Sequence, residues 1–573
     1  MSLNSKIFAD NISAPKVGRS KFKIPFEHKT TFKAGDLIPI YGCDILPGDS
    51  VDMNLSEVTR MLTPAVPVMD NAWLDIYFFF VPNRLLSKCP GLFRGPAHAD
   101  WETFCGANKD TAWAPQVETT IKGVAMQQIS SMSVANYFGA PIGVYWDEAS
   151  QSNPDILPFK FIAYNMIWND FFRDETTQAP IDLRYGFANS SDLNGGWYLN
   201  ETVPGCVYGK TGYCLKANKY PDYFTRALPA PQRGPNVLLP LGNLAPVSTF
   251  NDTHDIQKVA LAGNLYKSDT SFVTSAQLGG STSRSDAEND AILFPSGTLG
   301  VNGSLFVPNN LWADLSQATG STVSQLRQAF AIQRFYEAMA RAGGGRYIEI
   351  LKGIFGTAPS DSRLQRPEFL SGKHIPLTIA QVLQTSATQS DSPLGNTGAV
   401  SQTNDYQHHF TASFTEYGQL IGLAVVRNEQ SYSQGLSKEW TKFRFFDNYL
   451  PQFAHLSEQP VYKRELYLNK GALSNEVFGY QEAYCEYRMK PNLITGNLAP
   501  RSGDLSLTPW TFTTNFSVAP TLNDEFKKSD SSQIGATLVD TSTSTQFVAD
   551  FYFDATFVRP MPVDSYPGFI DHF

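Results

Sequence analysis

Near the C-terminus of the chain, apolar and mostly aromatic residues recur at every second position over a dozen residues. These positions are Phe547, Ala549, Phe551, Phe553, Ala555 and Phe557. A period of two is that of a β-strand, in which successive side chains point to opposite faces of the sheet. The pattern therefore predicts a half-buried strand with one aromatic face.

Two further segments show strand patterns. Residues 410–417 alternate in the same way, turn at Gly418 and continue into the apolar run Leu420–Val426. We interpret this as a β-hairpin whose second strand is buried on both faces. Residues 73–81 form another core strand, which Pro82 ends. Because fifty or more residues separate some of these strands, the connections are long enough to carry function or assembly contacts.

Two helices are also predicted. In the first, a spacing of four and three places five apolar residues on one helical stripe. They are Leu157, Phe161, Tyr164, Trp168 and Phe171. The second helix begins near Ser324, a suitable N-cap, and runs to Ala342, after which three glycines stop it.

The composition fits a β-rich chain with long loops. The chain is 13% aromatic and only 17% charged, and it contains 42 Gly and 36 Pro. Its 573 residues, 42% of them hydrophobic, can bury a substantial core in two or three domains or in one large β domain with insertions. A free cytosolic enzyme usually has about a quarter of its residues charged. The low charge indicates that partners rather than water cover much of the surface.

The charge is unevenly distributed along the chain. The net charge of −9 argues against a protein whose main task is to grip nucleic acid. Residues 1–33, however, hold seven basic side chains and two acidic ones, which gives the acidic body a basic arm. Such an arm can neutralise a few phosphates, and an ordinary flexible tail is the alternative. The candidates for contact with DNA are Lys16, Arg19, Lys21 and Lys23.

Residues that carry catalytic or metal chemistry are scarce. Val203–Thr211 superficially resembles a phosphate-binding loop, but Pro204 replaces its first Gly and removes a backbone donor. The adjacent His408 and His409 face opposite ways on a strand, so they cannot readily share a metal ion. No CxxC, HExxH or GxSxG motif occurs. We therefore predict a protein that is not an enzyme and that has no cofactor, no metal site and no catalytic residue.

Two segments alternate aromatic and basic residues, Trp440–Phe446 and Tyr484–Lys490. Aromatic rings can stack on unpaired bases while Arg or Lys holds phosphate. Core aromatics with solvated basic neighbours are the alternative interpretation.

The polar N-terminal residues lack the apolar core of a signal peptide. The longest apolar runs, residues 76–81 and 420–426, are too short to cross a bilayer. We expect synthesis in a cytoplasm and no membrane insertion.

The stretch Tyr220–Pro235 contains four prolines, three aromatic residues and no catalytic chemistry, which predicts a rigid, extended connector. It closely resembles a signature in the major capsid proteins of small single-stranded DNA phages, the gokushovirus branch of the Microviridae. Further segments resemble the same family in the same order: Ile38–Tyr41, Leu46–Asp49, Pro67–Asn71, Phe78–Arg84, Gln459–Pro460, Val477–Gln481, Ala483–Arg488 and Lys490–Pro491. The resemblance extends from about Phe22 to the C-terminus, except for a divergent centre.

This resemblance implies a mostly β fold, an eight-stranded antiparallel jelly roll of the viral capsid type with long loop insertions and a few helices. It implies a major capsid protein that self-assembles into a T=1 icosahedral shell around single-stranded DNA. The partners implied are other copies of the chain, the packaged DNA, a small basic DNA-binding protein, pilot or minor virion proteins, and a bacterial surface receptor. The implied location is the virion, assembled in the cytoplasm of the host bacterium.

Four segments follow from these observations. Residues 1–35 are the basic arm, residues 36–235 and 323–573 are the two parts of the jelly roll, and residues 236–322 are a variable surface insertion. In the resembling family this position holds a loop that projects near the three-fold axes. We expect residues 251–311 to be outermost and to recognise the host, or alternatively to tie three subunits together.

Two other functions remain open at the level of sequence. One is a jelly-roll enzyme or carbohydrate-binding protein. The other is a free single-stranded DNA-binding protein.

Overall fold

The structure is a computed structural model. It describes residues 18–86, 124–144, 155–183, 187–189, 197–200, 214–232, 237, 247–249, 265–266, 307–308, 311–313, 323–341, 366–383, 385, 394–395, 397–454, 457–468, 476–500, 507–540 and 545–564. The chain divides into two compact units, Met1–Arg233 with Glu337–Phe573, and Gly234–Tyr336. The predicted insertion, residues 236–322, falls within the second unit.

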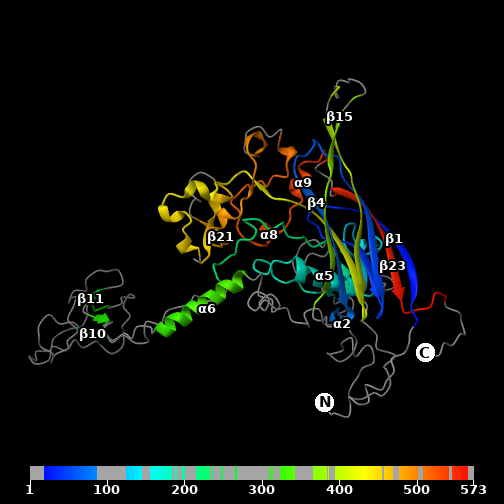
Figure 1. The fold of residues 1–573 in the computed structure, drawn as a ribbon, viewed down its shortest axis with the longest axis horizontal. Helices are drawn as coiled ribbons and strands as arrows, with labels where there is room; N and C mark the ends of the chain where they lie inside the picture. Colours follow the sequence, from blue (N-terminus) through cyan, green and yellow to red (C-terminus); the bar gives the residue numbers. More distant parts are fainter. Residues whose placement is uncertain are drawn as a thin grey trace, which may run out of the picture. The chain divides into compact units, whose positions relative to one another are not determined.

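The first unit contains two four-stranded antiparallel sheets. In order across the first sheet lie β1 (Ser20–Phe32), β23 (Phe547–Arg559), β3 (Ser50–Met61) and β17 (Thr403–Ser413). In order across the second sheet lie β14 (Glu368–Pro376), β4 (Ala72–Pro82), β18 (Gly418–Asn428) and β2 (Ile38–Ile45). The first and last of these strands, blue and red in Figure 1, lie side by side although more than 500 residues separate them in sequence.

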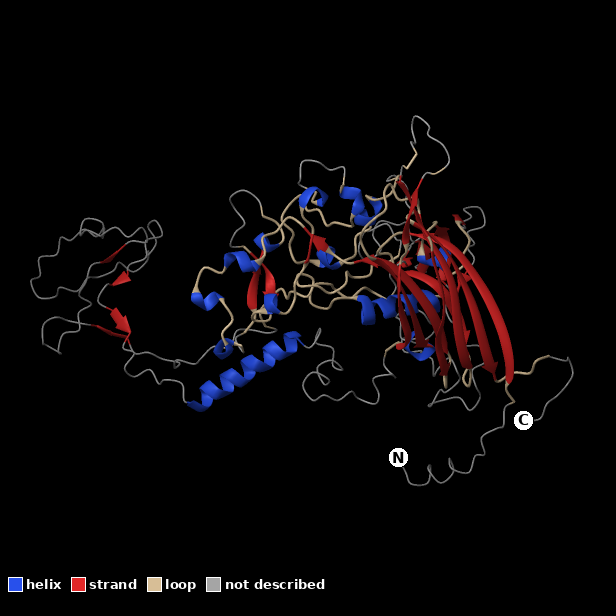
Figure 2. Cartoon of the chain, turned by 45° about the horizontal axis from the view of Figure 1, so that its top comes forward, coloured by secondary structure: helices blue, strands red, loops and turns tan. Residues whose placement is uncertain are grey.

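The two sheets face each other across one hydrophobic core, which makes them a β-sandwich. Every apolar position of the predicted alternating strand in β23 is buried, so that prediction is confirmed. The ring of Phe553 meets the ring of Phe78 on β4 edge to face, with centroids 6.4 Å apart, and the ring of Tyr41 on β2 at 4.8 Å. Aromatic pairs of this kind add about 0.5–1.5 kcal/mol each to the free energy of burial. Figure 2 shows the long strands of the sandwich in red.

Strand β18 of the second sheet is buried on both faces, as predicted for residues 420–426. Leu420, Ala424 and Val426 of β18 face the sandwich core, while Ile421 and Leu423 pack against a second cluster beneath helix α5 (Phe159–Ile167). This helix continues as the π-helix η1 (Trp168–Phe172). Together α5 and η1 confirm the first predicted helix for the positions from Phe161 to Phe171, and this stripe packs on the outer face of the sheet. The prediction is wrong for Leu157, which precedes the helix and is 49% exposed.

The predicted hairpin at Gly418 is wrong. Its two strands, β17 and β18, belong to different sheets, so residues 414–417 carry the chain across the sandwich. Phe414 is buried there against Phe80, at 4.5 Å between ring centroids. A Cβ at Gly418 would lie 2.3 Å from the Phe80 ring, so the crossing needs glycine at that position. Alternation fixes which face of a strand is buried but not which strand it pairs with.

A third layer of the first unit is made mainly of loops. Its hydrophobic cluster joins residues from the Tyr220–Pro235 stretch with residues after β18, among them Phe224, Tyr432, Val461, Phe478 and Phe526. The strand pairs here are β19 (Ser431–Tyr432) with β22 (Asn492–Leu493), and β20 (Gln459–Tyr462) with β21 (Val477–Gln481). The short helices are η6 (Lys438–Thr441), η7 (Phe445–Asp447), η8 (Pro451–Phe453), η9 (Lys463–Glu465), η10 (Cys485–Tyr487), η11 (Gly496–Leu498), η12 (Thr508–Trp510), α8 (Asp524–Lys527) and α9 (Ser532–Gly535).

Smaller elements complete the described part of the chain. In the first unit they are α2 (Asn83–Leu86), α4 (Val134–Tyr137), the sheet of β5 (Val124–Ile129), β6 (Gly143–Val144), β7 (Asp155–Ile156), β8 (Phe187–Asn189) and β9 (Trp197–Asn200), and the ribbon of β15 (Ile379–Leu383) with β16 (Thr397–Ser401). In the second unit β10 (Val247–Thr249) pairs with β13 (Leu311–Ala313), and β11 (Leu265–Tyr266) pairs with β12 (Val307–Pro308). The second predicted helix is confirmed as α6 (Val323–Arg341), which crosses the boundary between the units.

Candidate assembly and nucleic-acid-binding surfaces

The basic segment at the N-terminus is in part a strand. Lys16 lies outside the described residues, Arg19 directly precedes β1, and Lys21 and Lys23 lie on β1, the edge strand of the first sheet. The predicted arm, residues 1–35, therefore contributes a full-length strand to the sandwich from Ser20 onward. Sequence patterning missed this strand because it is an edge strand with a mixed polar and apolar composition.

The solvent-facing side of this sheet carries charges of both signs. The Lys23 ammonium lies 3.1 Å from the Asp554 carboxylate on β23, and this hydrogen bond raises the pKa of Lys23. Lys29 pairs with Glu27 in the same way at 2.9 Å. Lys21 makes no ion pair with any part of the chain that the structure describes. Of the two described lysine candidates for DNA contact, Lys21 is the one that makes no ion pair with the described residues. Its charge contributes to the lowered pKa of Asp52 only after the Thr411 and His408 hydrogen bonds.

The adjacent histidines face opposite sides of β17, as predicted. A β-bulge lies between His408 and Phe410. The His408 Nε2 lies 2.8 Å from the Asp52 Oδ1 on the solvent side, whereas the ring of His409 is buried against Phe78 at 4.9 Å. Burial lowers the pKa of His409 to about 4. Within the described ranges, no group of three or more His, Cys, Asp or Glu side chains is arranged to hold a metal ion.

Tyr220, the first residue of the signature stretch, belongs to a buried group of hydrogen-bonded polar side chains. The carboxylate of Asp75 on β4 is almost fully buried and accepts hydrogen bonds from the Tyr220 hydroxyl at 2.7 Å and from the Arg427 Nε at 2.9 Å. The Arg427 guanidinium also lies over the Tyr220 ring, at 4.3 Å from the centroid, and donates to the Asn218 carbonyl at 3.0 Å. Tyr220 thereby fixes the loop layer to the second sheet.

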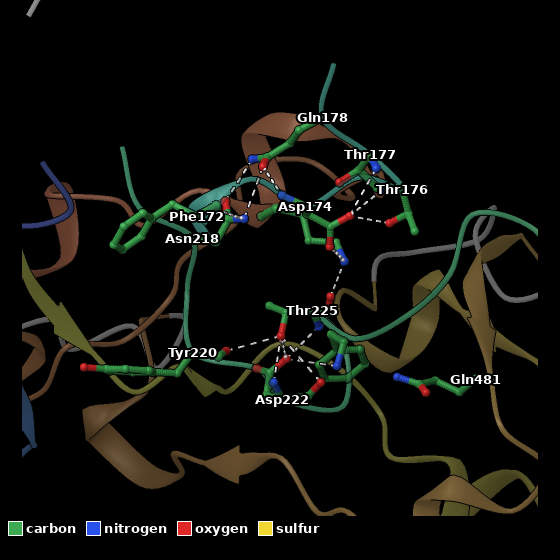
Figure 3. A network of polar contacts seen from close by, with 12 residues as sticks. Phe172, Asp174, Thr176, Thr177, Gln178, Asn218, Tyr220, Asp222, Thr225 and Gln481 are labelled. Carbon is green, nitrogen blue, oxygen red and sulfur yellow. Dashed lines mark hydrogen bonds and ion pairs between the residues drawn. The ribbon is translucent and has the colours of Figure 1, made fainter. Parts of the chain in front are cut away.

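The residues that follow Tyr220 form a capped turn rather than the predicted extended connector. The Asp222 Oδ1 accepts from the backbone amides of Phe224 at 3.0 Å and Thr225 at 2.7 Å, because an Asp at this place closes a turn on its own backbone. The other oxygen of Asp222 accepts from the Tyr432 hydroxyl at 2.6 Å. The Gln481 side chain donates to the Tyr223 carbonyl at 2.6 Å (Figure 3).

A second network anchors the turn to η1 and α8. The Lys527 ammonium bonds to the Thr225 carbonyl and lies 2.9 Å from the Asp174 carboxylate. Burial alone would raise the pKa of Asp174, but Lys527 and Thr176 lower it. Figure 3 shows Asp174 with Thr176 and Thr177 on one side and the Asp222–Thr225 turn on the other. The signature is therefore a structural staple, in which Asp222 bonds to its own turn and to Tyr432, while the Lys527–Asp174 pair lies beside the turn.

A cavity of about 760 Å³ lies beside this staple. Its lining includes basic residues such as Arg226 and Arg366 and acidic residues such as Asp170 and Glu482. Because the lining holds acids and bases in nearly equal number, it has no dominant charge with which to select an anionic or cationic ligand.

The segment Trp440–Phe446 contradicts the interpretation of its aromatic residues as core. The side chains of Trp440, Phe443, Phe445 and Phe446 are 72%, 86%, 71% and 67% exposed. In the second aromatic–basic segment, Tyr484 is buried and Tyr487 is half exposed. The sequence signal that marks this surface is the density of aromatic residues in a run without strand or helix periodicity.

A buried glutamate in the sandwich was also missed. Glu57 occupies an inward position of β3, directly opposite Asp405 on β17 and Phe551 on β23. Burial, with a smaller contribution from the Asp405 charge, raises the pKa of Glu57 to about 8. The sequence contains a sign of this buried acid. Met53, Leu55, Glu57 and Thr59 occupy alternate positions of one strand, and Glu57 stands where the pattern calls for an apolar residue.

Comparison with known proteins matches nearly the whole chain. A model of the family described as "Capsid protein (F protein)" matches residues 10–569. The capsid protein VP1 of Bdellovibrio phage phiMH2K is 36% identical over 566 residues, which cover 97% of this chain and 96% of that protein. The capsid protein VP1 of Chlamydia phage 1 is 35% identical over 602 residues, covering 96% of each chain. That of Spiroplasma virus 4 is 35% identical over 564 residues, covering 96% of this chain and 95% of that protein.

In the part of the chain that the structure describes, no helix is long and apolar enough to cross a membrane.

The raised pKa of Glu57 predicts a pH-dependent stability. A glutamate is ordinarily half protonated at pH 4.5, whereas folded Glu57 stays protonated up to about pH 8. Between these values the folded state binds more protons than the unfolded state, so stability falls as the pH rises, by at most about 1.4 kcal/mol per pH unit from this group. We expect Glu57→Gln to remove this contribution, so that its free energy of unfolding increasingly exceeds that of the wild type towards pH 8.

Denaturant unfolding at several pH values measures this difference. Glu27→Gln is the control on the same sheet, since Lys29 lowers the pKa of this exposed carboxyl, and it should leave the slope between about pH 5 and 8 unchanged. Parallel curves for the wild type and Glu57→Gln would show that Glu57 is charged in the folded protein.

Proposed function

Because this chain belongs to the capsid protein (F protein) family and is a structural component of a virion, we propose that identical copies of it close into a T=1 icosahedral shell around single-stranded DNA. The observation that carries the proposal is the length of the match. A family model matches residues 10–569, and relatives of nearly equal length match at both ends. The resemblance to gokushovirus capsid proteins that the sequence motifs indicated is confirmed.

We propose that the sandwich is a viral jelly roll. Numbered along the chain, the eight long strands lie in the order 1-8-3-6 in one sheet and 5-4-7-2 in the other. Two four-stranded sheets connected in this way wind twice as Greek keys, which is the arrangement of a capsid jelly roll. The long insertions leave this frame after the fourth strand and between the seventh and eighth.

The family also favours this function over the two alternatives. Its description and the names of the relatives are those of structural proteins, which supports the prediction that the chain is not an enzyme. A free DNA-binding protein would need a strongly basic surface, whereas this chain has a net charge of −9 and its described outer sheet pairs lysines with carboxylates. No observation favours carbohydrate binding.

Assembly is the direct test of the shell. The expressed chain, or the particle from its native source, should appear in electron micrographs as uniform small icosahedra. Light scattering should show one narrow particle size, with this chain as the main protein. A chain that stays strictly monomeric in its native source would contradict the proposal.

We place the basic N-terminal segment on the inside of the shell, with Lys16, Arg19, Lys21 and Lys23 near the DNA. What supports this is the concentration of basic residues in a chain that is otherwise acidic, and the lack of an ion pair between Lys21 and the described residues. A small basic DNA-binding protein would supply the rest of the neutralisation, and pilot or minor virion proteins would complete the particle, assembled in the host bacterial cytoplasm.

Replacing these four residues with Gln should lower the amount of packaged DNA and the heat stability of filled particles, and high salt should reduce the difference. Lys23→Gln alone is the control, because Asp554 already offsets its charge. The absorbance ratio and melting temperature of purified particles measure the effect. Unchanged packaging in the fourfold variant would leave the segment a protein–protein clamp or a tail.

We further propose that residues 251–311 are a surface insertion that binds a bacterial receptor. The segment is rich in Ser, Thr, Gly and Asn, and it lies within a unit that is compact in its own right. The strands β10 and β13 pair with each other, with Thr249 opposite Leu311, so the two ends of the segment lie next to each other. Variable loops on a rigid scaffold commonly carry binding, and clustered copies would give weak contacts useful avidity.

The paired base suggests a clean deletion. Replacing residues 252–309 by a short Gly-Ser linker keeps β10 and β13 in register. A receptor loop predicts particles that assemble normally but fail to adsorb to host cells. Failure to form shells would identify the insertion as a clamp between subunits, and normal adsorption would refute the receptor role.

A further inference from the structure

The third layer has one surface in which the usual distribution of charged and apolar groups is inverted. Between Lys438 and Tyr449, the lysine side chains are turned inward and the aromatic rings outward. The side chains of Lys438 and Lys442 are only 18% and 11% exposed, while the aromatic residues 440, 443, 445 and 446 are all at least two-thirds exposed. We call this surface the aromatic patch. It comprises Trp440, Phe443, Phe445, Phe446 and the half-exposed Tyr449 and Tyr487.

A buried carboxylate contacts the two inward-facing lysines of the aromatic patch. Glu486, 9% exposed, lies 3.0 Å from the Lys442 ammonium and 3.6 Å from that of Lys438. Lys442 also lies 3.7 Å from the centre of the Tyr487 ring. The Asp447 carboxylate accepts from the Arg444 amide at 2.8 Å and closes η7. The rings are therefore presented by a backbone that is already fixed, so covering them costs little additional conformational entropy.

The exposed area is too large for a free subunit surface. Each aromatic side chain can bury about 150–250 Å², so four that are two-thirds or more exposed present on the order of 500 Å². Soluble monomers rarely expose a contiguous apolar patch of more than a few hundred Å². A standard interface buries about 800 Å² on each partner, and its centre is rich in Trp, Tyr and Phe. The aromatic patch matches the centre of such an interface.

The charges favour a protein partner over DNA. A groove that binds single-stranded DNA combines stacking rings with a positive track for the phosphates. Here Lys438 and Lys442 share Glu486, and Lys490 lies 3.5 Å from Glu439, so these three lysines already face carboxylates. Among the bases of residues 438–449, Arg444 alone makes no ion pair with the described residues. The remaining surroundings contain acids and bases in alternation, including the pair of Arg488 with Glu482, which fits the polar rim of a protein interface.

We propose that the aromatic patch is a contact between two copies of this chain, and that closure of the shell buries it. This inference rests on the proposed function and identifies one surface that carries it. In a shell built from a single kind of subunit, every copy presents the same patch to an equivalent neighbour, so one apolar surface contributes to every subunit contact of that type.

A photo-reactive phenylalanine analogue in place of Phe443 tests the contact without removing the ring. Irradiation of assembled particles should give a covalent band of twice the chain mass, and irradiation of dissociated subunits should not. Cross-links to DNA, to a smaller virion protein or only within one chain would each overturn the proposal.

A paired substitution tests its energetic role. Phe443→Ser with Phe446→Ser should leave the subunit folded, with an unchanged circular dichroism spectrum, and lower the yield of particles at least tenfold. The matched control is Tyr406→Ser with Tyr552→Ser, which removes two exposed rings from the outer face of the first sheet. The control should assemble as the wild type does.

The outcomes separate this inference from the function on which it rests. If the wild-type chain forms no particles, the proposed shell is wrong. If the wild type assembles and the Phe443→Ser, Phe446→Ser variant assembles equally well, or the control loses as much, the shell stands and the patch is not its contact.

Discussion

The rest of the molecule depends on one contact, in which the aromatic rings of β23 pack against those of β4 and β2. Phe553 meets Phe78 and Tyr41 in a core that draws strands from both ends of the chain. Each long insertion begins and ends at a strand of this sandwich. The distance between the two ends of an insertion is therefore fixed by the register of the strands that it connects. A shift of β23 by one residue would turn its four phenylalanines to solvent and its aspartates inward.

The loop layer depends on this frame through a small number of buried polar contacts. Asp75 projects from the second sheet and holds both Arg427 and Tyr220, and the turn after Tyr220 is in turn held by Tyr432, Lys527 and Gln481. A carboxyl group buried at this place is tolerated because Arg427 and Tyr220 bond to it. The result is a layer without long strands that nevertheless presents a fixed surface, and such a surface is what repeated subunit contacts require.

Much of this arrangement can be predicted from sequence, and the failures share a cause. The burial of Phe547–Phe557 and of residues 420–426 could be predicted, because the spacing of apolar residues along a strand is a local property of the sequence. The opposite orientation of His408 and His409 followed from strand geometry alone. The placement of β17 and β18 in different sheets did not, because a turn between two sheets and a turn within one look alike in sequence. The Asp222 turn itself is local, but its anchoring to Tyr432 spans 210 residues. The inward orientation of Lys438 and Lys442 likewise depends on Glu486, more than forty residues further along the chain, and no local pattern contains such partners.

The pairing of β1 with β23 has a consequence for how the subunit is made. Ser20 lies opposite Arg559 and Phe32 opposite Phe547, so the first strand of the sandwich has no neighbour on that side until the last one has been synthesised. Contacts between residues so far apart in sequence form slowly during folding. Until β23 has been synthesised, the apolar faces of the N-terminal strands stay exposed to solvent. A ribosome that stops early therefore releases a chain whose sandwich lacks its central aromatic strand.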